Sequence, residues 1–594
     1  MYRLRVFRGK FLAVGMALLV AAPMSFGATP PGNAYLIHNL VSNQFGIADF
    51  MDTNLVNPWG FATTASSPFW VTDGGTGLST VYSSNGTPSA TKPTIPPSAK
   101  GASPSTPTGI IANATGGFLV QGKAPSFIFV TADGTVSAWA SAVSATAAQL
   151  MVDNSSTNAA YYGLAISATT TNATPMLYAA NFNSGNIDIF DTNFKPVVMA
   201  GAFVDPSVPA GFAPWNIQNI GGKLYVMYAK QNAAKNFAGG GGGYVAMFDL
   251  NGNLLKHLVS NGPLNEPWGV AIAPATFGAF ANDLLVGNFG DGTINAFDPV
   301  AGTALGTLTD ENGNVVTIPG LWGLILGNGG SGGDPNAIYF AAGGATQKIG
   351  ILGSIQAAPT ITSVANAAAP QANIAPGAYI SIFGSDLAPI TRNWTLSDFA
   401  GGTSLPKSLD GVGVSVDGKA AYVYYISPKQ IDVLVAADTT TGPVPVVVTD
   451  NGLVSNSMTA TMAAVSPSFF LYKDNASIAA EHANGSIVGA TTLYTGLSTP
   501  AAPGETIALF GNGFGATTPA PTDGTVLTTA LPCATTPVVM VGGVAAPVTY
   551  CALVGVGLYQ VNVTIPSAAA AGNLPVTIAF GTVVSTAAKT INVL

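Results

Sequence analysis

Five polar residues stand near the ends of apolar segments and are of types that bind cations or polar ligands. Asp73, Asn181 and Asn288 each close one apolar segment, while Asn57 and Glu266 each precede another. Carboxylate and amide oxygens are the ligands that Ca²⁺ takes in proteins. If these segments are strands whose ends meet at one mouth, the five side chains predict a ligand-binding site there. Within it, Asp73, Asn181, Glu266 and Asn288 are the candidate Ca²⁺ ligands.

Turn chemistry offers a second interpretation of the same residues. Asp and Asn side chains close to glycine commonly accept hydrogen bonds from the following backbone in Asx turns, which need no metal. The pattern leaves both interpretations open. No other cofactor is indicated, and Ca²⁺ is the one candidate.

Nucleophiles and histidines are present but lack the context that catalysis needs. Residues 329–333 match the G-x-S-x-G pattern, which requires a strand–turn–helix to expose its serine. Here the pattern lies in a glycine-rich stretch and predicts a loop. His38 and His257 stand at matching places in two expected outer strands and are interpreted as surface residues, while His482 is isolated. We assign no catalytic residue from the sequence.

Two repeated motifs must position these residues. One is a glycine followed by an alternating segment, and its copies end at Tyr82, Trp139, Phe190, Phe248, Phe297 and, in a worn form, Leu352. The other precedes each copy and begins at Pro58, Pro107, Tyr161, Pro214, Pro267 and Leu321, with tryptophan second in four cases, at residues 59, 215, 268 and 322. Two phased motifs repeated six times at a period near 50 predict a six-bladed β-propeller. The tryptophans are expected to pack between blades.

The closure of the ring can be predicted from a shared outer-strand motif. Residues 38–42, His-Asn-Leu-Val-Ser, resemble residues 257–260, His-Leu-Val-Ser, which end the fourth blade. The first of these segments has no inner strands before it. We therefore expect it to complete the sixth blade, which would remove an open sheet edge.

A second kind of repeat follows the propeller. Residues 374–384 match residues 501–511, and residues 443–448 parallel residues 573–578. Each unit has about 100 residues of short alternating strands, which is typical of a β-sandwich. The predicted fold is all-β: a six-bladed β-propeller over 28–356, an Ig-like β-sandwich over 357–465, and a connector hairpin plus a second Ig-like β-sandwich over 466–594.

Both parts resemble known families. The segment Asn54–Gly60 and the turn ending at Gly292 resemble an uncharacterised family of exported bacterial propellers, similar to NHL and YVTN-type repeats. The motifs over 374–384 and 425–431 resemble the paired Ig-like, IPT/TIG-type module of uncharacterised secreted bacterial proteins. The resemblance implies a fold, a bacterial source and export. It implies no catalytic residue, and a fold alone gives no function.

The first 27 residues have the pattern of a secretory signal peptide. Four basic residues precede an apolar run, and Ser25-Phe26-Gly27 suits cleavage before Ala28. The apolar run is too short for a transmembrane anchor. The two cysteines, Cys533 and Cys551, flank an alternating segment with Gly542-Gly543 near its middle, so a hairpin would bring them together. In an oxidising compartment, periplasmic or extracellular, this favours a disulfide, with unpaired buried thiols as the alternative.

The composition narrows the class of partner. Charged residues are 8% of the 594 residues, the net charge is −8, and hydrophobic residues are 48%. An acidic chain with few basic residues is a poor binder of nucleic acid. We expect a monomeric, secreted, non-enzymatic recognition or scaffold protein that binds an unknown protein or glycan, with the Ig-like modules as spacer or second binding surface. The alternative is a Ca²⁺-dependent propeller hydrolase, similar to a lactonase, acting at the channel mouth.

Overall fold

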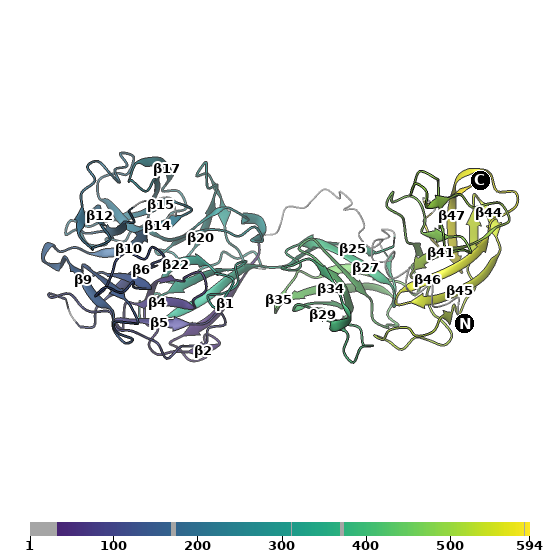
Figure 1. Cartoon of the computed structure of the whole chain (residues 1–594), viewed down its shortest axis with the longest axis horizontal. Helices are drawn as coiled ribbons and strands as arrows, with labels where there is room; N and C mark the ends of the chain where they lie inside the picture. Colours follow the sequence, from purple (N-terminus) through teal and green to yellow (C-terminus); the bar gives the residue numbers. More distant parts are fainter. Residues whose placement is uncertain (1–32, 102, 168–173, 311, 369–372, 587–588) are drawn as a thin grey trace. The chain divides into compact units, whose positions relative to one another are not determined.

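The computed structural model describes residues 33–594 except residues 102, 168–173, 311, 369–372 and 587–588 (Figure 1). The predicted signal peptide, residues 1–27, lies outside the described residues. The chain divides into two compact units, Gly32–Ala357 and Ala358–Leu594. In both, the regular structure is almost entirely β; the described residues hold three short 3₁₀ turns, at Ser155–Thr157, Gly278–Phe280 and Leu396–Asp398. No helix in these residues is long and apolar enough to cross a bilayer.

The first unit is a six-bladed β-propeller, as the repeats predict. The first three blades are β3 (Pro58–Ala62), β4 (Phe69–Asp73), β5 (Leu78–Tyr82); β6 (Pro107–Ala112), β7 (Phe127–Thr131), β8 (Thr135–Trp139), β9 (Gln149–Asp153); and β10 (Tyr161–Ile166), β11 (Leu177–Asn181), β12 (Asn186–Phe190), β13 (Pro196–Val197). The fourth and fifth are β14 (Phe212–Ile220), β15 (Lys223–Lys230), β16 (Tyr244–Phe248), β17 (Leu254–Ser260); and β18 (Pro267–Ile272), β19 (Leu284–Asn288), β20 (Ile294–Phe297), β21 (Ala304–Thr307).

The sixth blade closes the ring with the first described strand. It contains β22 (Leu321–Leu326), β23 (Ile338–Ala342) and β24 (Ile351–Ala357), followed by β1 (Tyr35–Ser42) and β2 (Phe50–Met51). β1 pairs antiparallel with β24 from Tyr35 opposite Ala357 to Ser42 opposite Ile351. The predicted closure is therefore confirmed, and it leaves the edge of β24 paired.

The innermost strands explain the recurring Trp-Gly pair. β3, β6, β10, β14, β18 and β22 each contact the next around the ring, and β22 contacts β3. Neighbouring backbones come so close that a Cβ at Gly269 would lie 2.4 Å from the Trp322 carbonyl oxygen. A side chain at position 269 would therefore clash with the neighbouring strand, which explains the glycine there.

The second unit contains two β-sandwiches. The first pairs the sheet of β25 (Thr360–Asn366), β27 (Tyr379–Ser385), β33 (Gln430–Leu434), β32 (Tyr422–Ile426) and β28 (Arg392–Asn393) with that of β26 (Asn373–Ile374), β36 (Met458–Met462), β34 (Gly442–Asp450), β30 (Val412–Val416), β29 (Ser408–Leu409), β31 (Lys419–Ala420) and β35 (Leu453–Val454). Alternate residues of β30 and β34 are buried in a core shared by the two sheets. This is the alternation expected of strands with one face inward.

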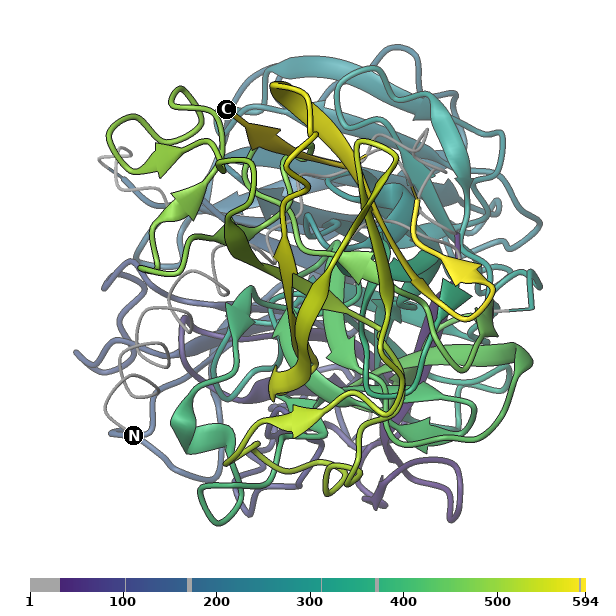
Figure 2. The same ribbon diagram turned by 90° about the vertical axis from the view of Figure 1, so that its right-hand side faces the viewer.

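The second sandwich has the same two-sheet plan, and its long strands are yellow in Figure 2. One sheet contains β37 (Ser468–Phe469), β38 (Ala480–Glu481), β39 (Ile487–Val488), β40 (Ser498–Thr499), β41 (Thr506–Asn512), β42 (Leu531–Pro532), β45 (Val548–Gly555) and β46 (Leu558–Thr564). The other contains β43 (Val538–Val541), β44 (Val544–Ala546), β47 (Gly572–Phe580), β48 (Val583–Val584) and β49 (Thr590–Val593). The expected connector hairpin corresponds to β38 and β39, but β38 pairs with β41, so this segment extends the sheet.

Candidate functional site

Aromatic side chains fill the propeller axis where the innermost strands begin. The Trp59 and Trp322 rings stack with centroids 3.4 Å apart. The Trp59 centroid also lies 6.0 Å from that of Trp215 and 6.3 Å from that of Trp268. These four side chains come from blades one, four, five and six, so they meet across the axis and do not simply fill gaps between adjacent blades. Together with Tyr162, which stacks on Trp59 at 5.4 Å, we call them the aromatic plug.

Two phenylalanines extend the aromatic plug. Phe289 stacks on Trp322 with centroids 4.1 Å apart, and Phe237 stacks on Trp215 at 4.6 Å. The two phenylalanine rings also contact each other edge to face at 5.7 Å. Stacked and edge-to-face pairs at these separations are favourable. Rings therefore occupy the end of the axis at which the sequence predicted a polar mouth.

The predicted site residues at the ends of second strands are buried in their own blades. Asp73 is fully buried; one carboxylate oxygen accepts a hydrogen bond from Thr80 N at 3.1 Å, and the other has no partner in the described residues. Burial raises its pKa well above the ordinary value. Asn181 and Asn288 accept hydrogen bonds from Ala160 N and Asn265 N, across the loops that enter the innermost strands. These contacts are structural and reach across the blade, whereas the bond from Ser184 N to Asn181 Oδ1, at 3.3 Å, is of the local kind that turn chemistry predicts.

The other two predicted residues border the aromatic plug. Asn57 Oδ1 accepts a hydrogen bond from Trp322 Nε1 at 3.3 Å. The same Nε1 also donates to Gln347 Oε1 at 3.2 Å. Glu266 is 4% exposed, and within the described residues its carboxylate accepts one long hydrogen bond, 3.4 Å, from Gly241 N; burial raises its pKa. No hydrogen bond in the described part of the chain joins any two of the five predicted residues.

This geometry gives the predicted Ca²⁺ site no support. Among the described residues, no three His, Cys, Asp or Glu side chains are grouped as a metal site requires. A calcium ion takes six to eight oxygen ligands, and burial without ionic partners disfavours the charged form of Asp73 and Glu266.

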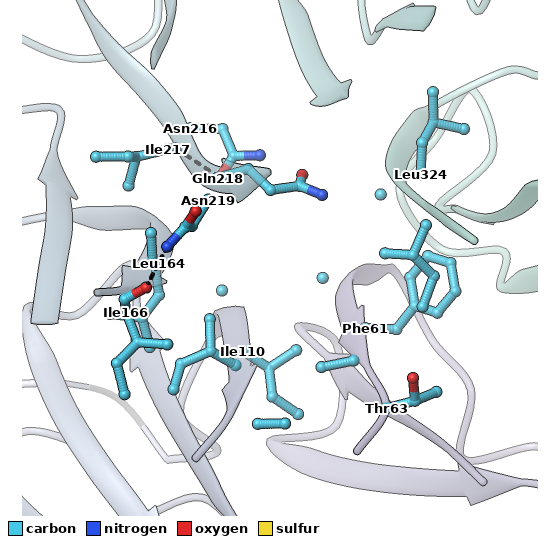
Figure 3. A pocket seen from close by; sticks show the side chains of 18 of the residues that line it. Phe61, Thr63, Ile110, Leu164, Ile166, Asn216, Ile217, Gln218, Asn219 and Leu324 are labelled. Carbon is cyan, nitrogen blue, oxygen red and sulfur yellow. Dashed lines mark hydrogen bonds between the residues drawn. The ribbon is translucent and has the colours of Figure 1, made fainter. Parts of the chain in front are cut away.

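A cavity of about 340 Å³ occupies the axis beyond the aromatic plug (Figure 3). All six innermost strands line it, largely with aliphatic side chains such as Ile110, Leu164, Ile217 and Leu324. The strands are buried where they begin and become solvent-accessible where they end, at residues such as Leu326. The cavity therefore opens at the face opposite the predicted mouth.

Blade four supplies the polar part of the cavity wall. Asn216 Nδ2 donates to Trp268 O at 2.8 Å and Asn219 Nδ2 donates to Ile166 O at 2.7 Å, so both are fixed. Gln218 lies between them, half-buried, and its amide makes no hydrogen bond within the described residues. Figure 3 shows its side chain extending into the cavity. Gln218 stands outside every repeated motif of the sequence, although Asn216 in place of the usual glycine marks blade four as different.

The predicted cysteine pair is joined in the second unit. Cys533 and Cys551 form a disulfide with Cα atoms 5.5 Å apart, and β45 carries the second cysteine. Both pack against the core of the second sandwich.

The chain is similar in sequence to proteins of a giant virus. Uncharacterized protein R648 of Acanthamoeba polyphaga mimivirus is 33% identical over 343 residues, which are 56% of this chain and 82% of that protein. Uncharacterized protein L690 of the same virus is 31% identical over 343 residues, 56% of this chain and 88% of that protein. The chain belongs to the family of these mimivirus proteins. No protein-family model matches it, and the bacterial source implied by the sequence resemblance stays a prediction.

Solved propellers are only distantly similar to this member of the mimivirus family. A streptogramin B lyase structure has 11% sequence identity and a TM-score of 0.33, covering 54% of this chain and 97% of that one. A protein of unknown function from Bacteroides thetaiotaomicron has 13% identity and a TM-score of 0.34, covering 54% and 76%. Such scores carry no argument about activity, and the propeller assignment rests on the strand pairing given above.

Proposed function

We propose that the propeller is a recognition module that binds a small, largely apolar ligand in its axial cavity. The observation that carries this proposal is the cavity of about 340 Å³ lined by all six blades. Pockets for small molecules start at roughly 300 Å³ and combine apolar walls with a few polar groups. The aromatic plug closes one end, so the ligand enters where the innermost strands end.

The polar groups on the wall narrow the ligand class. The Gln218 amide can donate and accept, and nothing in the described residues satisfies it. Trp268 also lines the cavity, but its indole N–H is buried and is not accessible from it. The unsatisfied Gln218 amide N–H favours a ligand that carries a hydrogen-bond acceptor such as a carbonyl. A flat apolar body with one carbonyl oxygen matches these features.

We extend the proposal to the two β-sandwiches and to export of the chain. The two β-sandwiches would act as a spacer or as a second surface for a protein or glycan. Export is supported by the signal-peptide pattern over 1–27 and by the disulfide in the second unit, since disulfides persist in oxidising compartments. The Ca²⁺-dependent hydrolase at the predicted mouth has no observation in its favour.

Binding can be tested with a neutral, polarity-sensitive probe. The dye 6-propionyl-2-dimethylaminonaphthalene has an apolar ring system and one carbonyl, and its emission changes on leaving water. We expect the full chain to bind it and Gln218→Leu to bind it about five-fold more weakly, since one hydrogen bond contributes about 1 kcal/mol. Ala112→Trp places a large side chain in the cavity wall and should abolish binding.

A matched variant separates the cavity from non-specific adsorption. Ala210→Trp adds the same side chain at an exposed loop position of the same unit. It should bind the dye as the unmodified chain does. Equal affinities for the unmodified chain and Ala112→Trp would overturn the proposal.

A further inference from the structure

Three side chains on the outside of blade four form a continuous series of hydrogen bonds. None of the three lines the axial cavity. His257 Nδ1 lies 2.6 Å from Asp205 Oδ2, and His257 Nε2 lies 2.5 Å from Ser260 Oγ. A carboxylate only accepts hydrogen bonds, so Nδ1 carries the ring proton. Nε2 is then free to accept the proton of the serine hydroxyl. An activated nucleophile has this arrangement: a hydroxyl on a base that a third group orients.

A β-bulge brings the histidine and the serine to one face of the sheet. Residues three apart on a regular strand point to opposite faces. In β17, Ser260 pairs with Tyr244 and His257 pairs with Ala246, so Leu258 is an extra residue. The extra residue reverses the alternation, and His257 and Ser260 therefore share a face. Asp205 reaches them from the loop that leads into β14.

Burial decreases along this series of hydrogen bonds, from Asp205 through His257 to Ser260. The Asp205 side chain is 0% exposed and that of His257 is 21% exposed, while Ser260 is exposed. The second Asp205 oxygen accepts a hydrogen bond from Ser207 N at 2.9 Å, which fixes the carboxylate. The acid is thus fixed and shielded from water, and the hydroxyl is accessible to a substrate.

The blade architecture does not require these three residues. β1 in the sixth blade has the same bulge, at Leu40, between Asn39 opposite Gly353 and Val41 opposite Leu352. The register makes Asn39, not His38, the counterpart of His257, which corrects the alignment made from sequence. Ser42, the counterpart of Ser260, is buried and accepts a hydrogen bond from Gln44 N. In the described residues, the Ser260 hydroxyl makes no hydrogen bond other than that to His257.

We propose that Ser260, His257 and Asp205 form a second, catalytic site that hydrolyses short-chain carboxylic esters. Ser260 Oγ attacks the ester carbonyl carbon as its proton passes to His257 Nε2. The carbonyl re-forms, the bond to the alcohol oxygen breaks, and Nε2 returns the proton to the leaving alkoxide. A water molecule then attacks the acyl-serine and gives a proton to Nε2; the bond between the acyl carbon and Ser260 Oγ breaks, Nε2 returns the proton to Oγ, and the acid leaves. Asp205 is a positioning residue, because it holds the histidine tautomer that this exchange needs.

Active-site labelling of the full chain tests the proposal. A fluorophosphonate probe should label one residue, Ser260, as shown by peptide mass spectrometry. The chain should hydrolyse p-nitrophenyl acetate, whose good leaving group demands little of the site. Ser260→Ala should abolish labelling, and His257→Gln should lower both rates at least 100-fold, the scale of general-base catalysis.

Two further variants distinguish catalysis from a structural role. Asp205→Asn keeps an oxygen for Ser207 N but presents an NH₂ to His257 Nδ1, which imposes the wrong tautomer. Labelling should slow at least ten-fold while the thermal midpoint changes little. Ser42→Ala removes the matching serine of blade six and should leave labelling unchanged. A folded chain that resists the probe, or labelling at Ser260 that persists in His257→Gln, would overturn the proposal. Dye binding in the cavity is independent of either result.

Discussion

Asp73 is of a residue type that binds metals, but its burial in this fold lowers the stability of the propeller at neutral pH. It is fully buried, one of its oxygens lacks a partner in the described residues, and burial raises its pKa. The folded propeller therefore binds a proton at Asp73 more tightly than the unfolded chain does. Stability from this group is present at low pH and is lost as pH rises above the unfolded pKa, toward the folded one.

We expect Asp73→Asn to raise the thermal midpoint of the propeller at pH 7.5. The amide oxygen can keep the hydrogen bond from Thr80 N, and the amide nitrogen can donate to Thr80 Oγ1, which has no partner in the described structure. The gain should shrink as pH falls toward 4, because the raised pKa favours the neutral carboxyl in the folded chain. Thermal unfolding at both pH values, with EDTA and with added Ca²⁺, measures this. A calcium-dependent rise in the midpoint that Asp73→Asn removes would instead restore the metal site.

At the scale of elements, β1 is the strand that closes the propeller. Tyr35 in β1 is fully buried, its ring stacks on Phe280 and contacts Phe277, and its hydroxyl donates to Phe277 O at 3.1 Å. The strand thus fastens blade six to blade five as well as pairing with β24. Its contribution comes from side-chain packing in addition to the backbone ladder.

Tyr35→Ala should lower the free energy of unfolding of the propeller by about 3–5 kcal/mol, the usual cost of removing a buried aromatic ring. Ile37→Ala is the matched control, because Ile37 lies on the same strand with its side chain 37% exposed. Its effect should stay below about 1 kcal/mol. Urea unfolding followed by tryptophan fluorescence measures both. A loss of unfolding free energy for Tyr35→Ala as small as that for Ile37→Ala would show that β1 acts only through its backbone.

At the scale of the molecule, each compact unit has its own core, and only the second carries the disulfide. Export and oxidation can therefore be tested together. We expect the exported chain to begin at Ala28 and to have no reactive thiol. A chain made without residues 1–27 in a reducing cytoplasm should have two. Because the bridge closes 18 residues of sequence, its loss should destabilise Ala358–Leu594 by about 3 kcal/mol.

The propeller midpoint should be the same in the two preparations, which provides an internal control. N-terminal sequencing, thiol titration and thermal unfolding make the comparison. An exported chain that retains residues 1–27, or one with two free thiols, would contradict the export proposal.

The sequence by itself determined the number of blades, the closing strand and the all-β class. These follow from spacing, because each blade repeats one strand–turn pattern, and a Trp-Gly pair marks the innermost strand of blades one, five and six. Local pattern also identified Asp73, Asn181 and Asn288, although it could not choose between a metal site and turns.

Only the tertiary structure shows the cavity and the hydrogen-bonded side chains on which the two proposals rest. The aromatic plug and the cavity bring together side chains from blades far apart in the sequence, so no local spacing encodes them. The bulge at Leu258 changed which face His257 presents, and the partner Asp205 stands 52 residues away. An inserted residue reverses the side-chain alternation on which sequence reasoning depends, so spacing alone could not show that His257 and Ser260 share a face.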